Sequence, residues 1–191
     1  DLAQTSDSSA LVILGDGPHG AAPLAIDVFT PSPGKPLRLT EVVPAFCATA
    51  AARGCFRIYA DHWCLEVARE LATNGVQWLA IPGGNGGKLE CFTRLREVLP
   101  DLAISPPHRL LADQMRVCTS APLPGGGIAI RSPRVKGAHG DVLSAAAAAA
   151  SQLGSVRQYM SGPFNPAAIE TLLAGMLGGC EHRSIYGRWY S

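Results

Sequence analysis

The chain has 191 residues, of which 47% are hydrophobic and 16% charged, and its formal net charge is +1. This composition indicates one folded domain and excludes a disordered chain, and the low net charge excludes nucleic-acid binding through a globally basic surface. The six cysteines form no CxxC pair, so we expect buried free thiols and neither a zinc site nor a disulfide framework. No apolar run reaches the roughly 18 residues that a membrane span requires.

The N-terminal third predicts a hairpin followed by a helix. Residues 10–14 and 23–29 are apolar runs joined by a glycine-rich turn, which is typical of two antiparallel strands. After a proline-rich loop at 31–36, apolar residues at helical spacing predict a helix from residue 39 to about residue 54.

A strand–helix–strand unit comes next. Residues 55–61 and 76–81 predict buried strands, and residues 65–73 between them predict a helix whose end is marked by Asn74-Gly75, a pair that tolerates left-handed backbone. This unit places Asp61 at the carboxyl end of a central strand, where open α/β sheets hold their chemistry.

The glycine-rich stretch 82–88 invites comparison with a phosphate-binding P-loop. It is one residue too short for that motif, and Leu89 stands where a magnesium-binding Ser or Thr belongs. We therefore predict a flexible loop between a strand and a helix.

The C-terminal half predicts further helices and short strands. In chain order these are a helix at 89–99 ended by Pro100, a strand at 102–105, a helix at 110–118, a loop at 122–127, a strand at 128–130, an alanine-rich helix at 142–153 ended by Gly154, and a short helix at 166–177. The whole order predicts an α/β domain with a mixed sheet, antiparallel at the start and parallel after Arg57, flanked by helices.

Three aspartates stand where elements begin or end, namely Asp1, Asp61 and Asp141. Each has an ordinary structural explanation: Asp141 and Asp61 could cap the helices that follow them, and Asp1 could be a disordered terminus. Together, carboxylates from a sheet edge and from a helix packed on it could hold two Mg²⁺ or Mn²⁺ ions about 4 Å apart, which is the machinery of phosphodiester hydrolysis.

Several segments resemble the nuclease domain of tailed-phage terminase large subunits. The opening Asp-Leu-Ala with Asp-Ser-Ser-Ala-Leu-Val from Asp7, the Tyr-Ala-Asp ending at Asp61, the lysine-led helix from Lys88, and the His-Gly-Asp ending at Asp141 occur in the family's order. The resemblance covers residues 1–153 and implies an RNase H-like nuclease domain there, with residues 154–191 as a C-terminal extension that carries a short helix.

The resemblance also implies an activity. It implies a metal-dependent endodeoxyribonuclease that cuts concatemeric double-stranded viral DNA during genome packaging, with Asp1, Asp61 and Asp141 as catalytic ligands of two Mg²⁺ or Mn²⁺ ions. Its implied setting is the cytoplasm of the bacterial host, with the terminase small subunit and the portal as partners and no membrane.

The chain departs from the family pattern in two respects. Gly140 replaces the first aspartate of the family's closing pair. The ATPase motor domain that precedes this domain in the family, and most of the first strand that would present Asp1, are absent from the chain. Asp7 and Asp16 are alternatives for the first ligand, and His62 and His139 are left outside the metal shell because they lack the HExxH spacing.

Four basic residues are candidates for DNA contacts. Lys88 at a helix start could meet a phosphate, and Arg131, Arg134 and Lys136 could form a cationic strip just before Asp141, although solvated surface charges would give the same pattern. Two other functions fit the sequence: another RNase H-like nuclease, such as a Holliday-junction resolvase or a transposase-like enzyme, and a catalytically inactive DNA-binding or assembly module.

Overall fold

The computed structural model describes residues 2, 7–17, 20–32, 34–104, 108–124, 127–132 and 139–160, with side chains omitted at 16, 17, 20, 99–104 and 154–160. The chain divides into two units, Asp1–Ser155 and Val156–Ser191. Every strand, and every helix except the end of the last one, belongs to the first unit, which also holds the residues of interest for function.

The predicted N-terminal hairpin is confirmed. Strand β1 (Ser9–Gly17) pairs antiparallel with β2 (Gly20–Phe29), and both strands are longer than the sequence indicates because polar and glycine residues of the turn also join the ladder. Helix α1 (Leu39–Ala52) follows and contains Pro44 in its interior.

The predicted strand–helix–strand unit is also confirmed. Strand β3 (Arg57–Ala60) pairs in parallel with β4 (Gln77–Ala80), and α2 (Leu65–Glu70) connects them. Asn74 has a φ of 56° and Gly75 a φ of 70°, so the Asn-Gly pair does adopt left-handed backbone, a few residues beyond the end of α2.

The C-terminal half differs from the prediction at three places. Helix α3 (Gly84–Ile104) begins inside the glycine-rich stretch and continues through Pro100, so the strand predicted at 102–105 is wrong over its described residues. A proline removes one helical hydrogen bond but does not always end a helix. Strand β5 (Thr119–Pro122) was not predicted, and α5 (Asp141–Met160) does not end at Gly154.

Two further elements agree with the sequence, and the helix predicted at 166–177 lies outside the described residues. Helix α4 (Arg109–Val117) matches the predicted helix at 110–118, and β6 (Ile128–Arg131) matches the predicted strand at 128–130. However, β6 pairs antiparallel with β5 instead of extending a parallel sheet. Among the described residues the strands therefore form three separate pairs: β1–β2, β3–β4 and β5–β6.

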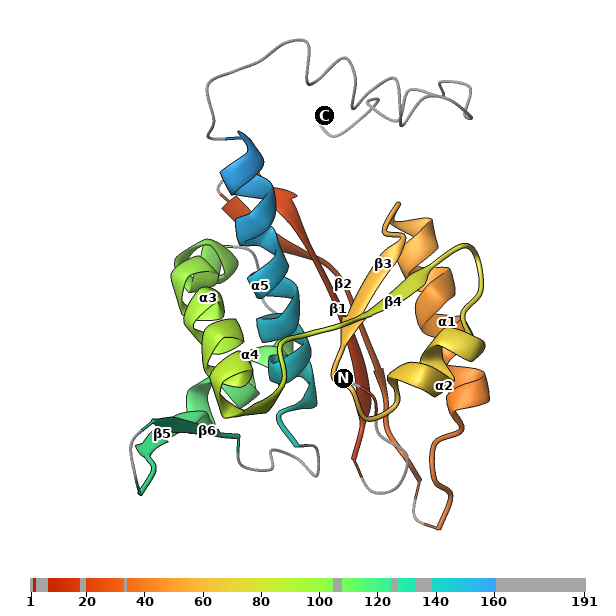
Figure 1. Cartoon of the computed structure of the whole chain (residues 1–191), viewed down its shortest axis with the longest axis horizontal. Coiled ribbons are helices and arrows are strands. Elements are labelled where there is room, and N and C mark those ends of the chain that lie inside the picture. Colours follow the sequence, from red (N-terminus) through yellow and green to blue (C-terminus); the bar gives the residue numbers. More distant parts are fainter. Residues whose placement is uncertain are drawn as a thin grey trace. The chain divides into compact units, whose positions relative to one another are not determined.

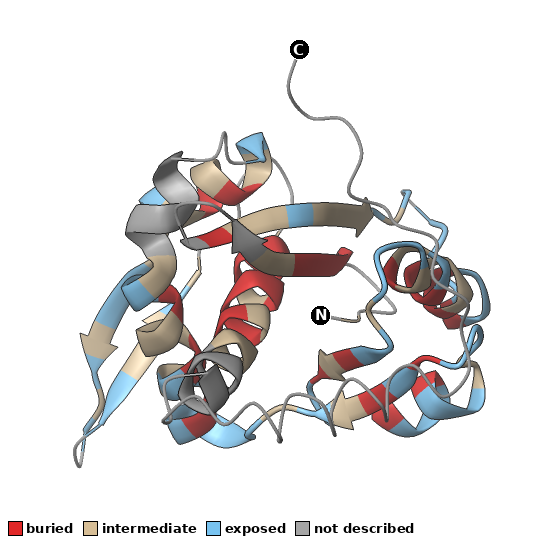
Figure 2. Ribbon diagram, turned by 90° about the horizontal axis from the view of Figure 1, so that it is seen from above, coloured by how far each residue is buried: buried red, intermediate tan, exposed pale blue. Residues whose placement is uncertain are grey.

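Strand β1 lies between two hydrophobic clusters. Leu11 and Ile13 belong to a cluster with α1, α2, β3 and β4, whereas Ala10 and Val12 belong to a second cluster with α3, α4 and α5. Figure 1 shows α1 and α2 on one side of β1 and α3 and α5 on the other. The alternation follows from the two-residue period of a strand. Nearly every residue in the first turns of α5 is buried (Figure 2), since this helix packs in a cluster that also contains residues of β1, β2, α3 and α4.

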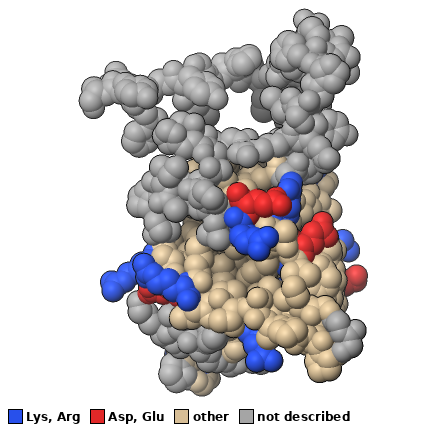
Figure 3. Space-filling view, turned by 90° about the vertical axis from the view of Figure 1, so that its left-hand side faces the viewer, with Lys and Arg blue, Asp and Glu red and all other residues tan. Residues whose placement is uncertain are grey.

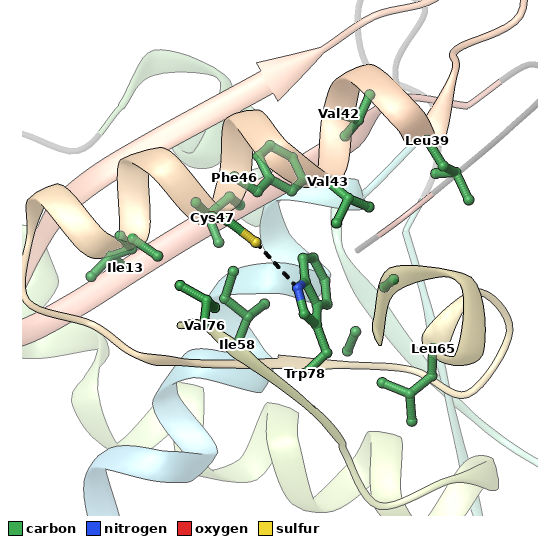
Figure 4. Close-up of a cluster of buried hydrophobic side chains, with 14 residues drawn as sticks. Ile13, Leu39, Val42, Val43, Phe46, Cys47, Ile58, Leu65, Val76 and Trp78 are labelled. Atoms are coloured by element: carbon green, nitrogen blue, oxygen red, sulfur yellow. Dashed lines mark hydrogen bonds between the residues drawn. The ribbon is translucent and has the colours of Figure 1, made fainter. Parts of the chain in front are cut away.

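Trp78 and Phe46 occupy the centre of the first cluster (Figure 4). The indole Nε1–H of Trp78 points at the Cys47 Sγ at 3.4 Å, and the rings of Phe46 and Phe29 meet edge-on with centroids 5.5 Å apart. The five described cysteines are free thiols, but only Cys47 and Cys91 are buried, so the prediction of buried thiols is confirmed for these two alone. In the described part of the chain, no helix is both long and apolar enough to cross a membrane.

We expect Phe46→Ala to lower the free energy of unfolding by about 3–5 kcal/mol, because Phe46 is 1% exposed and its removal leaves a cavity. Phe56, which is 54% exposed, provides a matched control, and Phe56→Ala should cost less than about 1 kcal/mol. Urea unfolding measures both. Equal losses would contradict the burial of Phe46.

Candidate functional site

Asp141 is the first residue of α5 and is 6% exposed. Its carboxylate accepts a hydrogen bond from the backbone N–H of Ser8, which immediately precedes β1. The second carboxylate oxygen, Oδ2, is buried and has no hydrogen-bond partner among the described residues. A buried polar oxygen without a hydrogen-bond partner is costly in free energy, so Oδ2 requires an explanation.

The surroundings of Asp141 raise its pKa above the ordinary value. Burial is the main cause and the nearby negative charge of Asp7 adds to it, while the Ser8 N–H and the His139 imidazole act in the opposite direction. The His139 Nε2 lies 3.8 Å from Asp7 Oδ1, close enough for an ion pair when the imidazole is protonated. A bound cation would favour the ionised carboxylate and so oppose this rise in the pKa of Asp141.

Asp61 follows β3 directly and is exposed. Its Oδ1 accepts the backbone N–H of Trp63 at 3.0 Å, a local turn that fixes the carboxylate relative to the chain. Helix α2 begins only at Leu65, after Cys64 as its N-cap, so Asp61 does not cap that helix. Burial, followed by the charge of Asp61, raises the pKa of the Cys64 thiol.

Asp61 lines a cavity of about 230 Å³ between the carboxyl ends of β3 and β4 and the two helices α3 and α5. Lys88 from α3 and Ala145 and Ala148 from α5 are also part of its wall. Asp141, Ala145 and Ala148 are spaced four and three residues apart, so they share one face of α5. Asp141 therefore lies one helical turn from the cavity wall, on the same side of the helix.

The predicted basic residues are partly described. Lys88 is exposed in α3, with its Nζ 5.8 Å from the centroid of the Phe92 ring, and Arg131 is exposed at the end of β6. Arg134 and Lys136 lie outside the described residues. The cationic strip before Asp141 therefore remains a prediction, apart from the exposure of Arg131.

The first predicted ligand, Asp1, also lies outside the described residues. Of the two alternatives, Asp7 is near Asp141, whereas Asp16 is at the other end of β1. In the described part of the chain, which omits Asp1, no group of three His, Cys, Asp or Glu side chains could hold a metal ion. Among the described residues, Asp61 and Asp141 thus belong to no common three-residue metal site. A complete ligand set requires a further group.

The structure explains why a glycine precedes Asp141. A Cβ atom at Gly140 would lie 2.3 Å from the Cβ of Ser132, far closer than two carbon atoms can approach. Because that neighbour is the root of a side chain and not its flexible end, an acid at position 140 would require the backbone to move. The close approach of residues 132 and 140 therefore leaves no room for a side chain at position 140.

Sequence reasoning did not identify Gln114. This residue of α4 is 1% exposed, and its side chain is hydrogen bonded to the backbone on both sides of Asp141. The contact joins residues 25 and 29 positions apart, and a single glutamine in an amphipathic helix gives no signal of such a contact.

The comparison with solved structures supports the fold. No protein-family model and no curated protein matches the sequence. Among solved structures, the large terminase nuclease from thermophilic phage G20c with bound magnesium is similar, with a TM-score of 0.63 and 18% identity over 80% of this chain and 78% of the other. The same nuclease with bound cobalt gives a TM-score of 0.55 and 17% identity over 76% and 82%. The chain thus has the mixed α/β fold of a phage large terminase nuclease, as the resemblance in sequence implies.

The raised pKa of Asp141 predicts how the stability of the metal-free protein depends on pH. Between the ordinary carboxyl pKa of 3.8 and the raised one, the folded state binds more protons than the unfolded state, so stability falls as pH rises through this range. Asp141→Asn removes that contribution and should flatten this part of the profile, as measured by urea unfolding with a chelator present. The same slope in Asp141→Asn and the parent protein would contradict this assignment.

Proposed function

We propose that this chain is a divalent-metal-dependent endodeoxyribonuclease of the phage terminase type. The observation that carries the proposal is the buried Oδ2 of Asp141, which has no hydrogen-bond partner among the described residues and belongs to the helix face that also bounds the cavity lined by Asp61. The proposal is supported by a fold similar to that of a nuclease crystallised with magnesium and with cobalt.

The chemistry of Asp141 fits a hard divalent cation. Carboxylate oxygens are the preferred ligands of Mg²⁺ and Mn²⁺, and a cation would provide the partner that Oδ2 lacks and offset the repulsion from Asp7. Asp141 and Asp61 would hold the metal, and Asp1 is the third ligand that we propose. When bound, a pair of such ions activates water for attack on a phosphodiester and stabilises the leaving oxygen.

The protein's own groups orient these carboxylates before any substrate arrives. The Ser8 N–H binds one side of Asp141, and the Trp63 N–H fixes Asp61. Burial keeps bulk water away from Asp141 and so strengthens its attraction for a cation. Lys88 is part of the wall of the same cavity. We propose that it binds a backbone phosphate of the strand that is cut.

The substrate we propose is double-stranded DNA bound through its backbone. Basic and acidic side chains are interspersed on the face shown in Figure 3, in keeping with the net charge of +1. Binding should therefore depend on a few local contacts, from Lys88 and from Arg131, Arg134 and Lys136. We further propose the cutting of viral concatemers in the host cytoplasm as the setting, with an ATPase motor, a small subunit and a portal as partners.

Asp61→Asn and Asp141→Asn should each reduce Mn²⁺-dependent nicking of a supercoiled plasmid at least about 100-fold, because loss of a metal ligand costs more than the 10–100-fold loss typical of an outer-shell partner. Glu41→Gln is the control, since Glu41 is an α1 residue whose side chain is 70% exposed and lies 3.9 Å from Arg38, and it should cut at the parent rate. Circular dichroism verifies that all three variants fold. Full activity in either site variant would show that the site is misassigned, and no cutting by the parent protein would favour an inactive DNA-binding module.

Neutralising Arg131, Arg134 and Lys136 together to glutamine should reduce the slope of log affinity against log salt by about 3, because each lost phosphate contact lowers it by roughly 0.9. Arg57→Gln is the matched control, because Arg57 is exposed at the opposite end of β3 from Asp61. Fluorescence anisotropy with a labelled duplex provides the measurement. An unchanged slope in the triple variant would place the DNA path elsewhere.

A further inference from the structure

Gln114 joins α4 to both sides of Asp141. Its Nε2 donates to the carbonyl oxygen of His139 at 2.6 Å, and its Oε1 accepts the backbone N–H of Leu143 at 2.9 Å. At 1% exposure the side chain is almost completely buried, and these two bonds use both ends of its amide. The amide therefore binds the backbone two residues before and two residues after Asp141.

These bonds replace the N-cap that α5 lacks. The N–H of the third helical residue, here Leu143, is normally satisfied by the side chain of the residue before the helix. In α5 that residue is Gly140, which has no side chain and, because Ser132 lies so close, no room for one. Gln114 supplies the missing acceptor from another helix.

The replacement of the usual N-cap by Gln114 affects the hydrogen bonds that Asp141 can form. An aspartate at the start of a helix readily bonds to backbone N–H groups of its own first turn. Here Gln114 occupies the Leu143 N–H, and the carboxylate of Asp141 instead accepts from Ser8, while its buried Oδ2 has no hydrogen-bond partner among the described residues. Gln114 thus holds the backbone on both sides of this carboxylate.

We propose that Gln114 is a positioning residue for the metal site, acting through the backbone at His139 and Leu143. This inference rests on the proposed function, because it assigns to Gln114 the placement of a carboxylate that holds a cation. Gln114 does not touch the metal or the DNA. Its loss should weaken cation binding while leaving the ligands themselves in the chain.

The test is to replace Gln114 by methionine in the full 191-residue chain. Methionine has a similar size and shape but can form neither bond. The Mn²⁺ concentration that half-saturates the protein, measured by isothermal titration calorimetry, should rise about 10–100-fold, the range seen for loss of outer-shell partners. Saturating Mn²⁺ should recover most of the nicking rate, because the ligands are still present.

Leu111→Ala is the matched control for a purely structural effect. Leu111 lies one turn before Gln114 on α4 and is also 1% exposed, so its truncation destabilises the same cluster. This variant should lower the melting temperature but shift the Mn²⁺ midpoint less than twofold, measured well below the melting temperature of every variant. An unchanged midpoint in Gln114→Met, or an equal shift in Leu111→Ala, would overturn the inference.

If Gln114→Met does not fold, Gln114→Glu takes its place. The glutamate can still accept the Leu143 N–H, but it cannot donate to His139 when ionised. Its added negative charge favours cation binding, so a raised Mn²⁺ midpoint must come from lost positioning, and an unchanged or lower midpoint would overturn the inference. The parent protein separates the two proposals. If the parent protein does not bind Mn²⁺, the proposed function is contradicted. If it binds Mn²⁺ with the same midpoint as the Gln114 variants, only the role of Gln114 is contradicted.

Discussion

The packing of α5 and β1 into one hydrophobic cluster is the constraint on which the site depends. Ala146, Ala147 and Ala150 of α5 share this cluster with Ala10 and Val12 of β1. Alanine also favours the helix itself. As a result the first residue of α5 meets the start of β1, so the Asp141 carboxylate is in reach of the Ser8 N–H and the charge of Asp7.

That arrangement is costly for the metal-free fold. A buried polar group without a partner costs about 1–3 kcal/mol, and a neighbouring like charge adds to the cost. The surrounding hydrophobic cluster and the two bonds of Gln114 keep α5 in place despite this strain. A bound cation would offset this cost, which connects the burial of the Asp141 carboxylate to its proposed chemistry.

Local patterns predicted the parts of this account that depend on local sequence. The end of β3 just before Asp61, the onset of α5 within one residue of the predicted start at 142 and the parallel pairing around α2 follow from apolar runs and their boundaries. The path of α3 through Pro100 was missed because a proline was expected to end the helix. Gln114 and the clash at Gly140 could not be predicted, because both depend on contacts between distant segments that only the tertiary structure brings together.

The most direct test of the account is the position of manganese in crystals of the protein soaked with Mn²⁺, located by anomalous scattering. The account predicts a strong peak within coordination distance of Asp141 Oδ2, with the Asp61 carboxylate turned toward the same ion or its neighbour. The Ser8 N–H bond and both Gln114 bonds should be retained. Manganese bound only elsewhere, with Asp141 Oδ2 left without a ligand, would contradict the central claim that this oxygen is kept free for a cation.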